Sequence, residues 1–95
     1  MDYNYPVYWN EEKDCWEATY EDFLEAMDGF EFGVRFRGKG YYISNVSAFG
    51  WCVISREDPE HDFTCATRRQ FEENATIGGV PLKEAWPEVV ILELS

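Results

Sequence analysis

The stretch "FEFGVRFRGKGYYIS", residues 30–44, contains the strongest secondary-structure signal in the chain. Every second residue in 30–36 is large and apolar, and the residues between them are charged or glycine. This period of two is typical of a half-buried β-strand. The glycines of "GKG" at 38–40 tolerate positive φ, so we expect a hairpin that returns through 41–43.

Further strands are expected on the C-terminal side of this hairpin, at 51–56 and 62–66, with the acidic turn "EDPEH" at 57–61 between them. Strands so close in sequence favour an antiparallel meander. On the N-terminal side, Thr19 is a good N-cap, and apolar residues with helical spacing follow it. A helix is therefore predicted over 20–28.

The C-terminal third predicts shorter elements. Thr67 and Gln70 have capping-box spacing for a helix through 71–74, and Pro81 suits the start of a last short helix. The β-branched run at 88–94 is compatible with a strand or a helical turn, and we favour the strand. The expected fold is α+β, a single domain over 1–95: an N-terminal helix packed on an antiparallel β-meander of about four strands, one or two short C-terminal helices, and a possible closing strand.

Net charge restricts the partners. Nineteen acidic and eight basic residues give −11, which disfavours direct binding of nucleic acid and of anionic membranes. A basic protein surface is the favoured partner. Three cysteines with no CxxC pair and no signal peptide predict reduced thiols in the cytoplasm.

The segment at 10–29 concentrates eight carboxylates, and on the predicted helix Glu21, Glu25 and Asp28 repeat at i, i+4 and i+7. Like charges at this spacing destabilise a helix, as does an acid at its C-terminus. Local rules broken without structural gain point to function. The predicted partner-binding residues are seven acids and two aromatic anchors: Glu11, Glu12, Asp14, Glu17, Glu21, Glu25, Asp28, Trp9 and Trp16.

Other interpretations of these patterns stay open. The acidic surface serves solubility alone if the chain is a generic adaptor or structural domain. Asp58, Glu60 and His61 could serve a small hydrolase, but a solvated acidic turn is the commoner use of such a sequence. Cys52, His61 and Cys65 lack zinc-site spacing, so no metal is expected, and neither a catalytic residue nor a cofactor is expected.

Three segments carry a resemblance: "TYEDFLEAMDG" at 19–29, "VRFRGKGYYIS" at 34–44 and "FEENATIGGVPLKEAW" at 71–86. Together they resemble a set of small, acidic, mostly uncharacterised proteins of bacteria and phages. By charge and size such proteins are similar in kind to anti-CRISPR inhibitors. The resemblance implies a non-enzymatic inhibitor that docks on a nucleic-acid-processing enzyme such as a CRISPR nuclease. The sequence itself suggests a monomer or homodimer, because an exposed edge strand in the extended segment 3–9, or at 89–94, would allow strand pairing between two copies.

Overall fold

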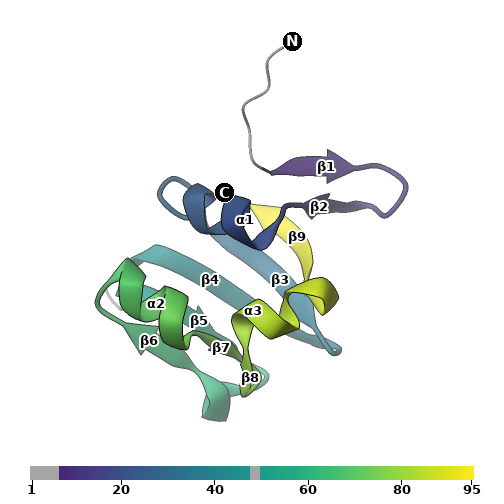
Figure 1. The fold of residues 1–95 in the computed structure, drawn as a ribbon. Coiled ribbons are helices and arrows are strands. Elements are labelled where there is room, and N and C mark those ends of the chain that lie inside the picture. Colours follow the sequence, from purple (N-terminus) through teal and green to yellow (C-terminus); the bar gives the residue numbers. More distant parts are fainter. Residues whose placement is uncertain (1–6, 48–49) are drawn as a thin grey trace.

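The computed structural model describes residues 7–47 and 50–95, without the side chains of 46 and 47. Most of this chain forms one antiparallel sheet with three short helices against it (Figure 1). In chain order the elements are β1 (Tyr8–Asn10), β2 (Cys15–Glu17), α1 (Tyr20–Ala26), β3 (Phe32–Phe36), β4 (Lys39–Ser47), β5 (Gly50–Ile54), the 3-10 turn η1 (Pro59–His61), β6 (Phe63–Cys65), α2 (Arg68–Asn74), β7 (Thr76–Ile77), β8 (Val80–Pro81), α3 (Leu82–Ala85), the 3-10 turn η2 (Trp86–Glu88) and β9 (Val90–Leu94).

The predicted architecture, an N-terminal helix packed on a four-strand meander, is wrong. The sheet has seven strands in the order β1-β2-β9-β3-β4-β5-β6, and two strands precede the first helix. Strand β1 begins at the end of the segment expected to be extended, and the missed strand β2 has only three residues, too few to display a period of two. A second small sheet, β7–β8, occupies the segment "TIGGVP" at 76–81, where the sequence predicts no strand.

The C-terminal strand occupies an unexpected position. Residues 90–94 form a strand, and β9 lies between β2 and β3, where it joins the N-terminal hairpin to the rest of the sheet. It is therefore not the exposed edge suggested by its position in the sequence. In the seven-stranded sheet, as far as it is described, the free edges belong to β1 and β6. Residues 3–6 of the segment expected to be extended lie outside the described residues.

The central hairpin forms around a two-residue turn. Phe36 pairs with Lys39, and the intervening Arg37 and Gly38 have φ angles of 50° and 81°. Positive φ at both turn positions is the geometry that matches the twist of paired strands. Glycine satisfies it without strain at the second position, so the chain reverses tightly at residues 37–38.

Both longer helices begin at the predicted caps. The Thr19 hydroxyl accepts a hydrogen bond from the Asp22 amide at 3.1 Å, and Thr67 forms a complete capping box with Gln70. Each helix then runs for seven residues. None of the helices described is long and apolar enough to span a lipid bilayer.

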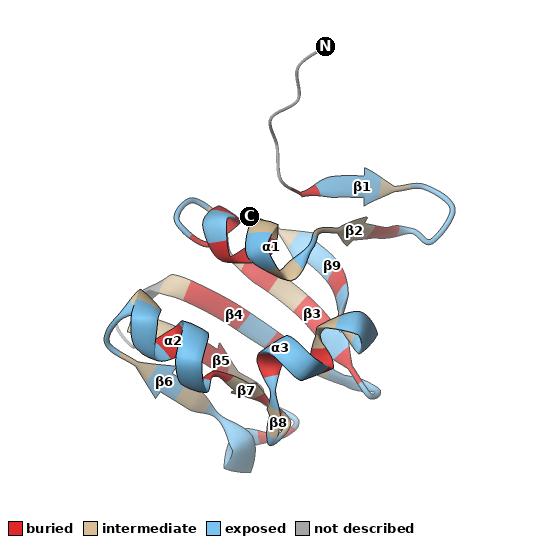
Figure 2. Cartoon of the chain, viewed as in Figure 1, coloured by how far each residue is buried: buried red, intermediate tan, exposed pale blue. Residues whose placement is uncertain are grey.

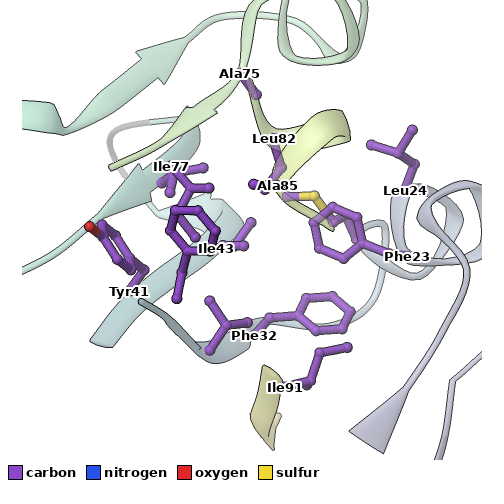
Figure 3. Packing of buried hydrophobic residues seen from close by; sticks show 14 of the residues in the cluster. Phe23, Leu24, Phe32, Tyr41, Ile43, Ala75, Ile77, Leu82, Ala85 and Ile91 are labelled. Carbon is purple, nitrogen blue, oxygen red and sulfur yellow. The ribbon is translucent and has the colours of Figure 1, made fainter. Parts of the chain in front are cut away.

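The core lies between one face of the sheet and the three helices (Figure 2). Phe23 of α1, Leu82 of α3 and Ile43 of β4 are fully buried there (Figure 3). Alternation along β3 explains the arrangement, because Phe32, Val34 and Phe36 face the core while Arg35 is exposed on the other side. Helices therefore cover one face of the sheet and leave the opposite face to solvent.

Candidate functional site

The β1–β2 hairpin extends away from the body of the protein (Figure 1). Its strands pair Tyr8 with Glu17, Trp9 with Trp16 and Asn10 with Cys15, and residues 11–14 form the exposed turn. The Asn10 side chain accepts a hydrogen bond from the Lys13 amide at 3.1 Å, which closes the turn. Three carboxylates, those of Glu11, Glu12 and Asp14, thus project from one tip.

Aromatic side chains occupy the strands behind this tip. The rings of Trp9 and Trp16 meet edge to face, with centroids 5.3 Å apart. Trp16 packs against the core, whereas Trp9 is 41% exposed and Tyr8 57% exposed. Large aromatics held in place yet partly exposed are typical of interface anchors.

Glu17 links the tip to the strands. Its Oε1 accepts a hydrogen bond from the Asn10 side-chain amide and lies 3.8 Å from the Lys13 ammonium. The Lys13 side chain is 70% exposed. Exposed ion pairs of this kind contribute at most about 1 kcal/mol, so Lys13 is only weakly held.

Of the other predicted acids, Glu21 and Glu25 lie on α1, and Asp28 follows it because the helix ends at Ala26 and not at the predicted residue 28. Glu25 and Asp28 both contact a basic residue of α2. Arg68 donates to Glu25 at 3.1 Å and to Glu72 at 2.8 Å, and it lies 4.0 Å from Asp28. The hydrogen bonds from the guanidinium to Glu25 and Glu72 raise the pKa of Arg68. Arg68 thus partly neutralises this end of α1, while Glu21 is exposed at its start.

The structure therefore places the nine predicted residues on the hairpin, on α1 and in the turn that follows α1. Trp9, Trp16 and four acids share the hairpin, Glu21 and Glu25 lie on α1, and Asp28 lies in the turn after the helix. The basic residues at 35–39 do not neutralise this surface: Arg37 instead forms a two-pronged contact with Glu88, at 3.2 Å for each nitrogen. Hydrogen bonding to Arg37 lowers the pKa of Glu88.

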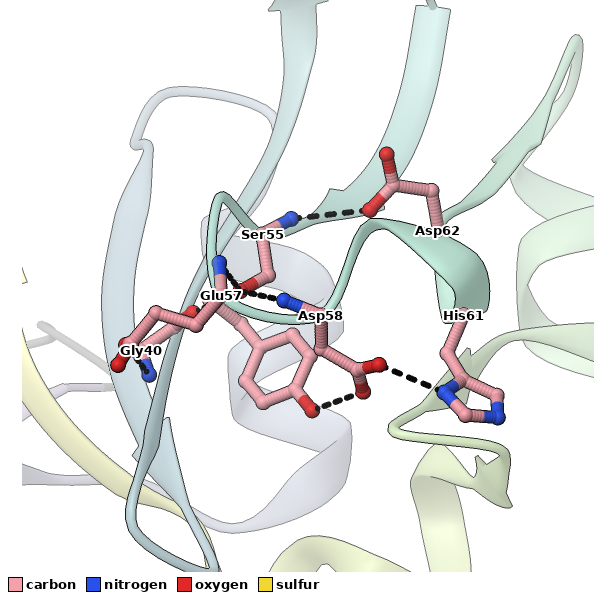
Figure 4. Close-up of polar contacts among 7 residues, drawn as sticks. Gly40, Ser55, Glu57, Asp58, His61 and Asp62 are labelled. Carbon is pink, nitrogen blue, oxygen red and sulfur yellow. Dashed lines mark hydrogen bonds and ion pairs between the residues drawn. The ribbon is translucent and has the colours of Figure 1, made fainter.

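Asp58 and His61, two of the residues considered for a hydrolase, form a polar network with Tyr41, whose part in it the sequence did not indicate (Figure 4). The Tyr41 hydroxyl donates to one carboxylate oxygen at 2.7 Å, and His61 Nδ1 lies 2.7 Å from the other. Asp58 is only 8% exposed, so the expectation that the carboxylates of this turn are all solvated is wrong for it. The turn gives no signal of this, because Tyr41 lies 17 residues earlier.

Hydrogen bonding defines the protonation states of this network. The contacts from His61 and then Tyr41 hold the pKa of Asp58 below its ordinary value. Burial, followed by the contact with Asp58, raises the pKa of Tyr41 to about 12. At neutral pH the pair is therefore a carboxylate and a neutral phenol.

Several cavities open on the described surface. One of about 470 Å³ lies on the uncovered face of the sheet between Tyr42, Arg56 and Leu92, and one of about 380 Å³ shares Tyr42 and Arg56 with it and reaches Asp62. A smaller cavity of about 270 Å³ lies between the hairpin, β9 and η2 and is lined by Trp16, Glu17 and Trp86. Across residues 7–47 and 50–95, no group of three or more histidine, cysteine or carboxylate side chains is placed to hold a metal ion.

The comparisons with known proteins assign the chain to no group. No protein-family model, curated protein or solved structure matches it.

Proposed function

We propose that this chain is a non-enzymatic acidic binding protein that docks on a basic, nucleic-acid-binding surface of a partner protein and inhibits it, in the manner of an anti-CRISPR inhibitor or nucleic-acid mimic. The observation that carries the proposal is the β1–β2 hairpin, where the exposed acids at 11, 12 and 14 project beside exposed Tyr8 and Trp9. Charge attracts the partner and sets its orientation. Desolvated aromatics supply affinity once the partner has docked.

The hairpin is a better docking element than α1. Glu25 and Asp28 share Arg68 with Glu72, whereas no ion pair is recorded within the described chain for Glu11, Glu12 or Asp14. Unshared carboxylates keep their full charge for an incoming cation. The hairpin also forms a free edge of the sheet.

Reversing two charges at the tip tests this function. The double variant Glu11→Lys/Glu12→Lys is expected to weaken inhibition about 30–100-fold, because like charges brought together at an interface cost several kcal/mol. Both positions are exposed turn residues, so the fold should survive. The assay measures cleavage by purified nucleases, CRISPR nucleases included, at increasing concentrations of the protein.

The matched control is Glu60→Lys/Glu84→Lys, which makes the same change in net charge at exposed positions of η1 and α3. It should inhibit like the unmodified protein. Equal loss in both double variants would show that only total charge matters, as a solubility role predicts. Failure of the unmodified protein to inhibit any nuclease would reject inhibition itself.

A second candidate, a small hydrolase, is favoured by one contact. Asp58 is buried and orients the His61 ring through Nδ1, an arrangement that suits a general base. If it is catalytic, His61→Ala should reduce turnover of ester or phosphoester substrates by about 10²–10⁴-fold. Equal rates for the variant and the unmodified protein would leave the network a structural role only.

A further inference from the structure

The smaller cavity joins aromatic walls to a single carboxylate. Trp16 of β2 and Trp86 of η2 line it, with Pro87 and Val89 completing apolar walls, and Glu17 is the one acidic side chain in the lining. Its volume of about 270 Å³ is below the roughly 300–1,000 Å³ of most small-molecule sites. One long side chain is a better match in size than a cofactor.

The Glu17 carboxylate is positioned to bind a cation. The Asn10 amide fixes Oε1 from one side, and no contact is recorded for Oε2 among the residues described. The side chain is 29% exposed. This carboxylate is held in one orientation and is partly desolvated, and one of its two oxygens is available to accept a further hydrogen bond. It therefore has both the charge and the geometry to bind a new cationic donor.

A cation of the protein itself already lies there. Lys13 lines the same cavity, with its ammonium 3.8 Å from Glu17 Oε1. At that distance and exposure the contact is weak. Lys13 thus marks where a positive charge is favoured without occupying the site firmly.

We propose that this cavity, lined by Trp16 and Trp86, receives an arginine side chain of the basic partner, which displaces Lys13 and pairs with Glu17. Arginine fits better than lysine because its planar guanidinium stacks on aromatic rings and donates two parallel hydrogen bonds to a carboxylate. The inference rests on the proposed function for the source of the arginine. It adds that the protein recognises one particular arginine side chain of the partner, in addition to the general attraction between the acidic tip and the basic surface.

A small probe tests the cavity without the partner. Titration with N-acetyl-arginine amide, followed by NMR of the indole N–H groups, should shift Trp16 and Trp86 saturably in the millimolar range. The neutral isostere N-acetyl-citrulline amide should not shift them, because it lacks the charge that Glu17 and the rings attract. Glu17→Gln should weaken arginine binding about tenfold, since hydrogen bonds to charged groups are the stronger kind.

Removing the internal competitor should have the opposite effect. Lys13→Met is expected to tighten binding of the arginine probe about two- to fivefold, the range that corresponds to an exposed ion pair. Matched controls on α3, Glu84→Gln and Lys83→Met, should change nothing, because neither residue lines the cavity.

Several results would overturn the proposal. Shifts confined to the amides of residues 11–14 would show attraction to the tip alone, and equal binding to the Glu17→Gln variant would exclude the carboxylate. Either result would leave the proposed function intact if the Glu11→Lys/Glu12→Lys variant still loses inhibition. Conversely, arginine binding without nuclease inhibition would support the cavity and reject the proposed function.

Discussion

Replacing Phe23 with alanine is expected to lower the free energy of unfolding by about 3–5 kcal/mol. Phe23 is fully buried, and its ring lies 4.3 Å from that of Trp86 and 5.0 Å from that of Phe32, between centroids. It therefore joins α1, η2 and β3 in one aromatic cluster. Small domains have about 5–15 kcal/mol of stability in total, so the variant should be close to unfolding at ambient temperature.

Urea denaturation followed by circular dichroism measures this loss. The matched control is Leu92→Ala, which removes a large apolar side chain from a position that is 39% exposed on the uncovered face of the sheet. Its cost should stay within about 0.5 kcal/mol, as for most surface substitutions. Similar losses for both variants would mean that the sheet is not packed on the face described above.

The second large effect is expected in the network around Asp58. Tyr41→Phe removes a buried hydroxyl and its 2.7 Å hydrogen bond, which should cost about 1–3 kcal/mol at neutral pH. Because the pKa of Tyr41 is raised to about 12 from 10.0, the phenol contributes stability below pH 10 that is lost as pH rises towards 12. The phenylalanine variant should lack this alkaline loss.

The pH dependence of stability expected from Asp58 is opposite to that expected from Tyr41. Its pKa is lowered from 3.8 in the folded protein, so its contribution is present above about pH 4 and is lost as pH falls through the lowered value. The difference in stability between the unmodified protein and Asp58→Asn should therefore shrink below pH 4. Glu60→Gln, an exposed neighbour, should show no such difference, and a constant gap across pH 2–7 for Asp58→Asn would refute the coupling.

Local signals were predictable from sequence, and long-range pairings were not. Thr19 and Thr67 were identified as caps because each bonds an amide three residues away. Strand β2 was missed because its position depends on the pairing of Trp16 with Ile91, which no local pattern encodes. Arg68 and Glu25 are also far apart in the sequence, by 43 residues, so their contact could not be predicted from a local pattern. The partial neutralisation of α1 by Arg68 was missed for the same reason.

The central place of β9 has a consequence for the order of folding. The hairpin β1–β2 is made before β9 during synthesis, but it joins the sheet only by pairing with β9, more than 70 residues later in the sequence. Bringing together segments so far apart in the sequence costs conformational entropy before the contacts between the strands form, and this slows folding. Until β9 has been made, the hairpin therefore has no neighbouring strand of the described sheet to pair with, and a two-stranded hairpin on its own is marginally stable at best.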